Sequence, residues 1–216
     1  MKKDLTELVF IIDRSGSMSG LESDTIGGYN AMLEKQKKEQ GEAVITTVLF
    51  DDKYELLHDR INIRVVEPIT EKDYFVRGST ALLDAVGKTI NKIGRVQNHT
   101  SENERAERVM VVITTDGMEN ASREFSHEKI KEMITHQKMK YGWEFIFLGA
   151  NIDSAEAADR FGIGRDMAAD YNADSAGTRL NYEVISQTVS DLRARRAISK
   201  EWKGRIDEDR ERRGER

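Results

Sequence analysis

The 216-residue sequence contains no cysteine and only one proline, Pro68. The absence of cysteine excludes a disulfide framework and a thiol nucleophile, and it fits a reducing compartment. No apolar run approaches the roughly 18–20 residues that a membrane-spanning helix requires. The formal net charge of −5 gives the chain as a whole no attraction for nucleic acid. Residues 1–4 lead directly into a strand-like segment without a signal-peptide core, so we expect a cytoplasmic protein.

Familiar catalytic motifs are missing as well. The sequence has no G-x-S-x-G, no G-x-x-x-x-G-K-[ST] and no H-E-x-x-H, and the lone G-x-G at residues 162–164 suits the end of a helix. The histidines are scattered without metal-ligand spacing: His58, His99, His127 and His136. A hydrolase would have to use Asp13, Asp51 or Asp116 as its general base. The sequence therefore predicts that the protein is not an enzyme.

The first informative segment follows a continuous apolar run at residues 8–12, which is typical of a strand buried on both faces. The run ends in Asp13-Arg14-Ser15-Gly16-Ser17. Two hydroxyls at positions i and i+2 can reach one small, hard cation if Gly16 lets the loop turn sharply, and a nearby carboxylate can hold a metal-bound water. A simple turn explains this segment equally well, because Asp, Ser and Gly are common turn residues.

Two further segments have the same character. A second apolar, β-branched run at residues 109–114 ends in Thr115-Asp116-Gly117, and Gly78-Ser79-Thr80 precedes a helix-like segment that begins at residue 81. A carboxylate just beyond a buried parallel strand lies where open α/β sheets bind their ligands. A turn at the Asp-Gly pair and an ordinary N-cap at the Ser-Thr pair are the alternatives. The three segments together, each beside the appropriate element, favour a shared divalent-metal site at one edge of a sheet.

In the order D-x-S-x-S, then T, then D, the segments resemble the metal-ion-dependent adhesion site (MIDAS) of the von Willebrand factor type A (VWA) domain. The resemblance covers about residues 4–190 and is strongest to bacterial or phage intracellular members of the family. It implies that Ser15, Ser17 and Thr80 ligate Mg²⁺ or Mn²⁺ through their hydroxyls. It also implies that Asp13 and Asp116 act largely through bound waters.

The family resemblance further implies a protein partner whose exposed Glu or Asp completes the coordination of the metal. An ATPase or an assembly component is a partner of the kind that such domains often have, and neither a membrane nor nucleic acid is expected. Because both carboxylates would act through water, the ion keeps much of its charge and an exchangeable position. That arrangement favours the binding of an acidic side chain over a closed, structural metal site.

The alternation of strand-like and helix-like segments predicts an α/β fold with a doubly wound, mostly parallel, Rossmann-like sheet and helices on both faces. One antiparallel edge strand is expected after the turn at Asp51-Asp52. The predicted strands are residues 8–12, 43–50, 54–66, 109–114, 143–148 and 167–171, and the predicted helices are residues 24–40, 81–96, 126–140, 153–161 and 177–197. Residues 97–108 are expected to form a polar surface loop.

Three details remain open at the level of sequence. Asp51 and Asp52 either lie near the metal or only form a hairpin turn. Gly27-Gly28 either lets the backbone pack closely against the sheet or the metal loop, or marks a ragged helix start. Residues 1–197 are expected to form the VWA domain, followed by a charged tail at 198–216 that is either a helical extension or disordered.

Two other functions compete with metal-dependent protein binding. The first is a metal-dependent phosphate-ester hydrolase, because an Asp after a parallel strand also occurs in phosphotransfer sites. The second is an accessory protein that binds nucleic acid through its charged tail. Ser15 stands where a phosphotransfer site would be expected to carry a second carboxylate, so the hydroxyl ligands favour adhesion.

Overall fold

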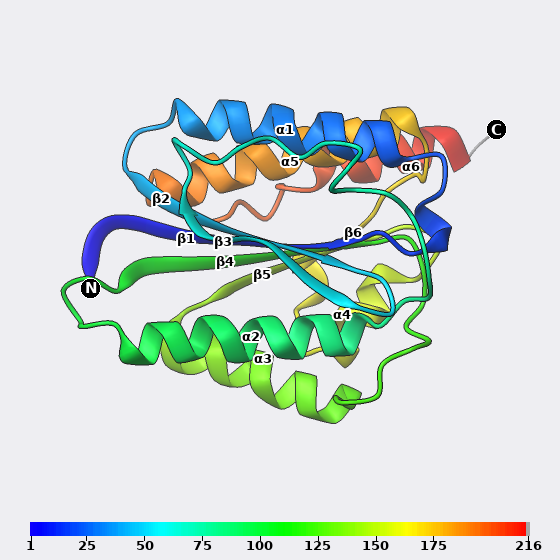
Figure 1. The fold of residues 1–216 in the computed structure, drawn as a ribbon. Helices are drawn as coiled ribbons and strands as arrows, with labels where there is room; N and C mark the ends of the chain where they lie inside the picture. Colours follow the sequence, from blue (N-terminus) through cyan, green and yellow to red (C-terminus); the bar gives the residue numbers. More distant parts are fainter. Residues whose placement is uncertain (215–216) are drawn as a thin grey trace.

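The computed structural model describes residues 1–214, and in this part of the chain a single six-stranded sheet lies between two layers of helices (Figure 1). The strand order across the sheet is β3-β2-β1-β4-β5-β6. The strands are β1 (Lys2–Asp13), β2 (Glu42–Phe50), β3 (Tyr54–Asn62), β4 (Ala106–Thr115), β5 (Glu144–Gly149) and β6 (Ala168–Asp170). All neighbouring pairs are parallel except β2 and β3, which are antiparallel. The predicted α/β fold with one antiparallel edge strand is therefore confirmed.

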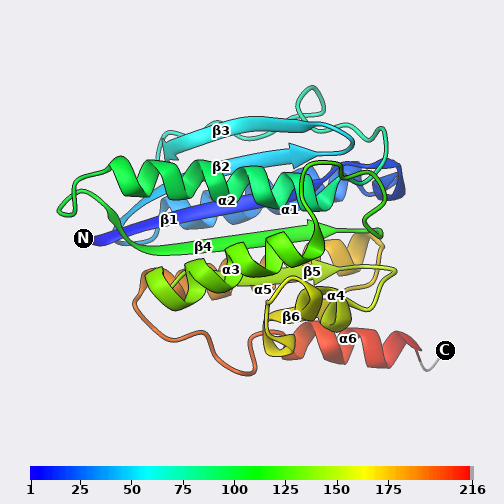
Figure 2. The same cartoon turned by 90° about the horizontal axis from the view of Figure 1, so that it is seen from below.

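The order of the strands reverses at the centre of the sheet, between β1 and β4. From β1 the chain adds β2 and β3 on one side, and it then crosses to build β4, β5 and β6 on the other side (Figure 2). In open α/β sheets, a crevice forms where the strand order reverses, just beyond the carboxyl ends of the two strands. The fold therefore places its natural binding position beyond Asp13 and Thr115, the last residues of β1 and β4.

Helices cover both faces of the sheet (Figures 1 and 2). One face carries α1 (Glu22–Lys37), α5 (Ser175–Arg193) and α6 (Gly204–Gly214). The other carries α2 (Leu82–His99), α3 (His127–Tyr141) and α4 (Ser154–Arg160). Two short 3₁₀ turns, Gly16–Met18 and Arg165–Met167, lie in the connections.

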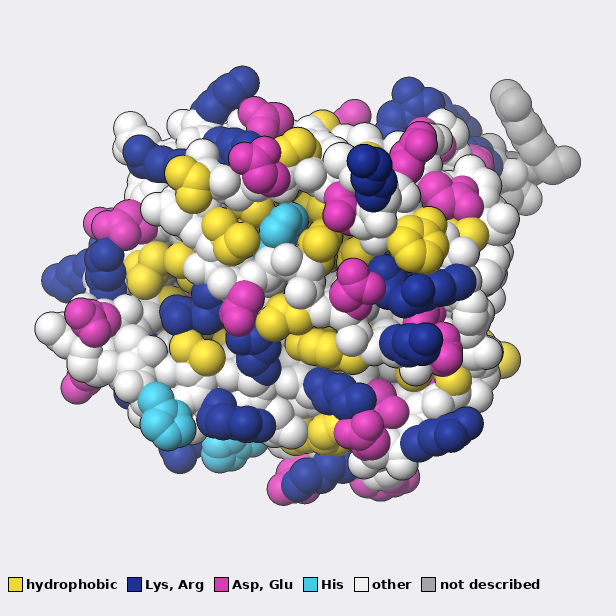
Figure 3. All heavy atoms as spheres, viewed as in Figure 1, with side chains coloured by type: hydrophobic (Ala, Val, Ile, Leu, Met, Phe, Trp, Pro, Cys, Tyr) yellow, Lys and Arg dark blue, Asp and Glu magenta, His cyan; other side chains and the backbone are white. Residues whose placement is uncertain are grey.

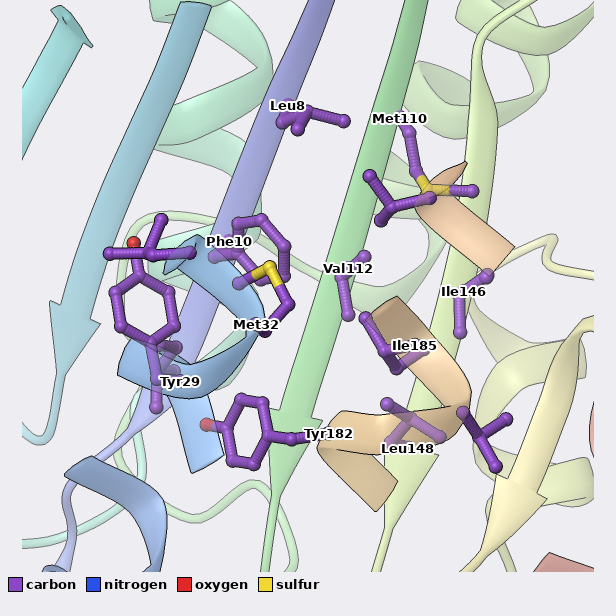
Figure 4. Packing of buried hydrophobic residues seen from close by; sticks show 14 of the residues in the cluster. Leu8, Phe10, Tyr29, Met32, Met110, Val112, Ile146, Leu148, Tyr182 and Ile185 are labelled. Carbon is purple, nitrogen blue, oxygen red and sulfur yellow. The ribbon is translucent and has the colours of Figure 1, made fainter. Parts of the chain in front are cut away.

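The continuous apolar run of β1 serves both cores, because alternate side chains of a strand point to opposite faces. Leu8 and Phe10 belong to the cluster beneath α1 and α5, whereas Val9 and Ile11 belong to the cluster over α2, α3 and α4. Figure 4 shows the first cluster, in which side chains of β1, β4 and β5 face those of the two helices. The labelled residues are Leu8, Phe10, Tyr29, Met32, Met110, Val112, Ile146, Leu148, Tyr182 and Ile185.

Several boundaries differ from the sequence-based prediction. The expected polar loop at residues 97–108 is shorter, because α2 continues to His99 and β4 already begins at Ala106. Strand β1 begins at Lys2 rather than at residue 8, since most of the residues between 2 and 7 are polar and interrupt the apolar pattern. Ser126 caps α3 as predicted, and its hydroxyl accepts a hydrogen bond from the Lys129 N–H.

The segment from residue 198 onward is helical at Gly204–Gly214 and packs on the rest of the chain. Trp202 and Ile206 are buried in the same cluster as the side chains of α1 and α5. Ion pairs join Arg210 to Asp170 and Arg213 to Asp174. Residues 215–216, the end of the predicted tail, lie outside the described part. The proposed division of the chain at residue 197 remains a prediction.

The surface carries basic and acidic side chains interspersed, as the face in Figure 3 shows. Within residues 1–214, none of the helices combines the length and the apolar character needed to cross a lipid bilayer.

Candidate metal centre

The three predicted segments meet at the crevice between the carboxyl ends of β1 and β4. Asp13 is the last residue of β1, Asp116 follows the last residue of β4, and Thr80 lies two residues before α2. Parallel strands deliver their carboxyl ends to one edge of the sheet, which is why Asp13 and Asp116 can meet there although they lie far apart in the sequence. Ser15 and Ser17 lie in the turn that follows β1.

Three hydroxyls form a tight cluster at this position. The Ser15 Oγ lies 3.0 Å from the Ser17 Oγ, and the Thr80 Oγ1 donates a hydrogen bond of 3.0 Å to the Ser15 Oγ. An octahedral Mg²⁺ site with metal–oxygen distances of about 2.1 Å has edges of about 3.0 Å between adjacent oxygens. The distances from the Ser15 Oγ to the other two hydroxyls therefore equal the spacing of neighbouring ligands around such an ion.

Glycines allow the loops to approach the hydroxyls. A Cβ on Gly117 would lie 3.1 Å from the Ser17 Oγ and 3.7 Å from the Thr80 Oγ1, so a side chain there would crowd the cluster. Gly78 has a φ of +66°, and a Cβ on it would collide with the Asp52 carboxylate. The Gly78 carbonyl accepts a hydrogen bond of 3.2 Å from the Gly16 N–H and so joins two of the loops. Gly16 itself needs no left-handed conformation, since a 3₁₀ turn starts at this residue and reverses the chain.

Asp13 is fully buried and held in one orientation. One carboxylate oxygen accepts a hydrogen bond of 2.7 Å from the Ser15 N–H, and the other accepts one of 2.6 Å from the Thr115 hydroxyl. Burial raises the pKa of the Asp13 carboxyl, against the opposing effect of these hydrogen bonds.

Asp116 is the second buried carboxylate, and the Asn151 amide donates a hydrogen bond to it. Burial raises the pKa of Asp116, the hydrogen bond from Asn151 opposes the shift, and the nearby charge of Asp13 adds to it. Within residues 1–214, neither Asp13 nor Asp116 forms an ion pair with a basic side chain. Two neighbouring carboxylates in a buried position without a positive partner are an environment that a divalent cation would stabilise.

Thr80 does not act as the N-cap of α2, which was the alternative explanation of its segment. The N-cap position belongs to Ala81, which makes no side-chain capping bond. The Thr80 hydroxyl instead points to Ser15, and its backbone N–H donates to the Asn120 side chain at 2.9 Å. The residue is therefore committed to the hydroxyl cluster rather than to the helix.

A buried arginine anchors the loop that follows β1. The Arg14 side chain, fully buried, donates to Asp51 at 3.0 Å and to Glu55 at 2.6 Å. Burial acts to raise the pKa of Asp51, but the hydrogen bonds from Arg77 and the Lys53 N–H, with the charge of Arg14, hold it below its usual value. Asp51 lies in the turn between β2 and β3, where one of its carboxylate oxygens accepts a hydrogen bond of 2.8 Å from the Lys53 N–H, so it forms the hairpin turn that was one of its two alternatives. The other carboxylate oxygen accepts hydrogen bonds from Arg14 and Arg77.

Three residues that support the site are not among the five that the sequence motifs predict. Thr115 orients Asp13, Asn151 orients Asp116, and the Tyr74 hydroxyl donates a hydrogen bond of 2.7 Å to the Asp13 carbonyl. The position of Asn151 directly after β5, the strand beside β4, is the signal that could have identified it. Tyr74 lies in an irregular segment, where no periodicity indicates its neighbours.

The donor set fits a small, hard divalent cation. It consists of three clustered hydroxyls and two buried carboxylates, all of which are oxygen donors. In the described residues, no group of three or more His, Asp or Glu side chains is arranged to hold a metal by itself. A cation here would therefore depend on the hydroxyls and on water.

Comparisons with known proteins find the fold rather than a close relative. No protein-family model matches the sequence, and a search of curated proteins finds no match. Among solved structures, the chain is similar to a von Willebrand factor type A protein from Catenulispora acidiphila, with a TM-score of 0.59 and 11% identity over 86% of this chain and 42% of that one. The manganese-loaded TRAP protein of Plasmodium vivax gives a TM-score of 0.59 and 16% identity over 83% of this chain and 73% of that one.

A third similar structure is proximal thread matrix protein 1 of the mussel byssus, with a zinc-occupied MIDAS motif. It gives a TM-score of 0.57 and 13% identity over 86% of this chain and 46% of that one. The chain thus spans less than half the length of the mussel and Catenulispora proteins. At these identities the similarity establishes the fold alone. The chain has the fold of a VWA domain, with the five predicted site residues at the carboxyl ends of β1 and β4 and before the start of α2.

Proposed function

We propose that the protein is a metal-dependent protein-binding domain that holds an acidic side chain of a partner through a divalent cation. The observation that carries the proposal is the cluster of three hydroxyls, in which the Ser15 Oγ lies 3.0 Å from each of the other two, beside two buried carboxylates. Mg²⁺ or Mn²⁺ is the cation that suits this set of oxygen donors.

In this proposal, Ser15, Ser17 and Thr80 bind the cation directly through their hydroxyls. Asp13 and Asp116 accept hydrogen bonds from waters on the cation, since their own orientation is fixed by Thr115 and Asn151. The bound cation supplies a positive centre with one exchangeable position for a carboxylate. Gly117 keeps the approach to the hydroxyls open, because it has no side chain.

Two structural neighbours support the choice of a divalent metal. The TRAP structure is manganese-loaded, and one form of the mussel protein has a zinc-occupied MIDAS motif. We infer a binding rather than a catalytic role, because no histidine or lysine forms a hydrogen bond or an ion pair with the five site residues in the described part of the chain. A cytoplasmic location and an acidic protein partner remain part of the proposal.

The first test is metal binding by calorimetry. Titration of Mg²⁺ and Mn²⁺ into the wild type should show one site, and Ser15→Ala and Thr80→Ala should each weaken it by at least tenfold. Ser19→Ala is the matched control, because Ser19 follows the same loop but is exposed. Circular dichroism should show all variants folded. A wild type that binds neither ion at millimolar concentration would contradict the proposal.

The second test concerns the partner. The purified protein should retain a partner from a lysate of the native host in Mg²⁺ and release it in EDTA, and Ser15→Ala with Thr80→Ala should fail to retain it. The same partners under all conditions would separate partner binding from the metal site and reject the proposed mechanism.

A further inference from the structure

A cavity of about 250 Å³ opens directly beside the candidate metal centre, on the side of β5. It lies between the loop that follows β4, the start of α2, and helix α4 with its flanking turns. Its apolar lining consists of Leu82, Met118, Phe147, Ile152, Ala157 and Phe161. None of these residues has a part in the candidate metal centre.

One wall of the cavity is aromatic. The rings of His127 and Phe161 stack at 5.6 Å with an angle of 10° between their planes, and Phe147 packs against Phe161 with ring centroids 5.6 Å apart. Phe147 and Phe161 are buried, so the wall is fixed by the core beneath it. Such a wall favours an aromatic or branched aliphatic guest, which gains both apolar burial and ring contacts.

The cavity and the candidate metal centre share a residue. Gly117 lines the cavity, and the Cβ position of the same glycine lies 3.1 Å from the Ser17 hydroxyl. Its neighbour Met118 lines the cavity as well and is 75% exposed, which is unusual for a large apolar side chain. The two sites are therefore one continuous surface, with hydroxyls on one side of Gly117 and apolar groups on the other.

Three of the charged residues around the cavity have partners of their own. The Glu119 carboxylate accepts hydrogen bonds from the N–H groups of Leu83, Ala121 and Ser122. Glu156 and Arg160 pair with each other at 2.6 Å. These three side chains therefore already have hydrogen-bond or ion-pair partners within the domain.

The opposite flank of the metal centre is different in kind. There a second cavity is lined by Gly78 and Ser79 together with polar or charged side chains such as Asp52, Asn120 and Arg123. A ligand seated on the metal would therefore meet polar groups on the β2 side and an apolar cavity on the β5 side. This asymmetry gives a bound peptide a preferred orientation.

We propose that the partner presents a large apolar side chain, aromatic or branched aliphatic, close in sequence to the carboxylate that binds the metal, and that this side chain enters the cavity beside Gly117. The inference rests on the proposed function, since it extends the same binding surface. The occupant is a protein segment with one acidic residue, which binds the metal, and one apolar residue, which lies toward β5 and enters the cavity.

The test uses simple carboxylates as probes: acetate, 3-phenylpropanoate and 5-phenylpentanoate, each titrated in Mg²⁺ and in EDTA. Binding is followed by nuclear magnetic resonance of protein labelled at the methyl groups of methionine and isoleucine. We expect one of the phenyl acids to bind about tenfold more tightly than acetate in Mg²⁺ and to shift the methyl signals of Met118 and Ile152. Acetate should leave the Ile152 signal unchanged.

A cavity-filling variant provides the second arm. Ala157→Leu places a larger side chain in the cavity and should abolish the advantage of the phenyl acid while leaving the Mg²⁺ and acetate affinities unchanged. Ala155→Leu is the matched control, because Ala155 lies on the same helix and outside the cavity lining, and it should retain the advantage.

The outcomes separate the two proposals. If Mg²⁺ and acetate bind but the phenyl group adds no affinity, the cavity inference is wrong and the proposed function stands. If the phenyl acid shifts the cavity signals equally in EDTA, the cavity is independent of the metal and the inference is again wrong. If Mg²⁺ does not bind at all, the proposed function itself fails.

Discussion

Glu7 is a carboxylate in the interior of the sheet, on β1, and its side chain is fully buried. It accepts a hydrogen bond of 2.7 Å from the partly exposed Arg60 and another from Gln97. Burial raises the pKa of Glu7, and the charge of Arg60 only partly offsets it. The folded protein therefore binds a proton at Glu7 more tightly than the unfolded chain does, so this residue makes the stability fall as the pH rises.

We expect Glu7→Gln to remove this pH dependence. Near pH 4 the wild type and the variant should have similar free energies of unfolding, because Glu7 is mostly protonated in both folded and unfolded wild type. As the pH rises from the ordinary glutamate pKa through the raised one, the wild type should lose stability relative to the variant, by about 1.4 kcal/mol for each unit of the shift. Urea unfolding between pH 4 and pH 8 measures the difference.

Glu42→Gln serves as the control for this experiment, because the Glu42 side chain is 58% exposed and lies at the start of β2. It should shift the unfolding curve little at any pH. A constant difference between wild type and Glu7→Gln across the range would show that burial does not govern the Glu7 carboxyl.

At the level of single residues, only part of the candidate metal centre could be predicted from the sequence. Asp13, Ser15 and Ser17 form a contiguous pattern beside a strand, so their chemistry could be recognised from the sequence. Thr115 and Asn151, which orient the carboxylates, have no such pattern, because their contacts depend on which strands are neighbours. Whether the five predicted residues bind a metal remains a prediction.

Helix α1 shows how one element depends on another. Gly27 and Gly28 are consecutive, yet their surroundings differ: a Cβ on Gly28 would lie 2.4 Å from the Tyr182 ring of α5, whereas a Cβ on Gly27 would have no heavy atom within 4 Å. The close approach suggested for this pair therefore exists, but at Gly28 alone and against α5 rather than against the sheet or the metal loop. The helix begins earlier, at Glu22, so the pair does not mark its start.

The two glycines give a matched pair of substitutions. Gly27→Ala should raise the free energy of unfolding by about 0.5–1 kcal/mol, because alanine favours a helix and the site has room. Gly28→Ala should lower it by about 1–3 kcal/mol, because the methyl group would force the Tyr182 ring to move. Thermal and urea unfolding in EDTA measure both, and an equal effect of the two substitutions would contradict the packing of α1 on α5.

The elements themselves were predictable where their patterns were long. Strand β4 has a continuous apolar run and helix α3 has a clear N-cap, and both lie close to their predicted positions. The last helix was harder to assign, because α6 is almost entirely charged. Only Ile206 within it and Trp202 just before it indicate a buried side. A pattern with so few apolar residues does not distinguish a packed helix from a solvated one.

At the scale of the whole molecule, the segment after residue 197 contributes to the core. Trp202 is 9% exposed, and its indole N–H donates a hydrogen bond of 2.7 Å to the Asp166 carbonyl. We expect Trp202→Ala to lower the free energy of unfolding by about 3 kcal/mol. Arg205→Ala, in the same segment but on a 62% exposed side chain, should change it by less than about 0.5 kcal/mol.

Urea unfolding in EDTA measures both variants, so that metal binding does not mask the difference. If the Trp202→Ala variant is as stable as the wild type, the segment after residue 197 is solvated and does not contribute to the core. In that case the domain would end near residue 197, as the sequence alone suggested.

The class of the fold was predictable because continuous apolar runs alternate with helical segments. The order of the strands was not, since β2 and β4 both follow helices and either could neighbour β1 on each side. Only the packed structure shows that the order reverses between β1 and β4, which is what brings Asp13 and Asp116 to one crevice.

The central position of β1 also has a mechanical consequence. The strand runs from Lys2 to Asp13 with β2 hydrogen-bonded on one side and β4 on the other, and the candidate metal centre lies at its carboxyl end (Figure 2). A tensile load between Lys2 and a partner held at the metal would run along a backbone that is already extended and has little slack. Pulling β1 out of the sheet along its own direction would require its hydrogen bonds to β2 and to β4 to break together. An edge strand, in contrast, can be peeled away one bond at a time.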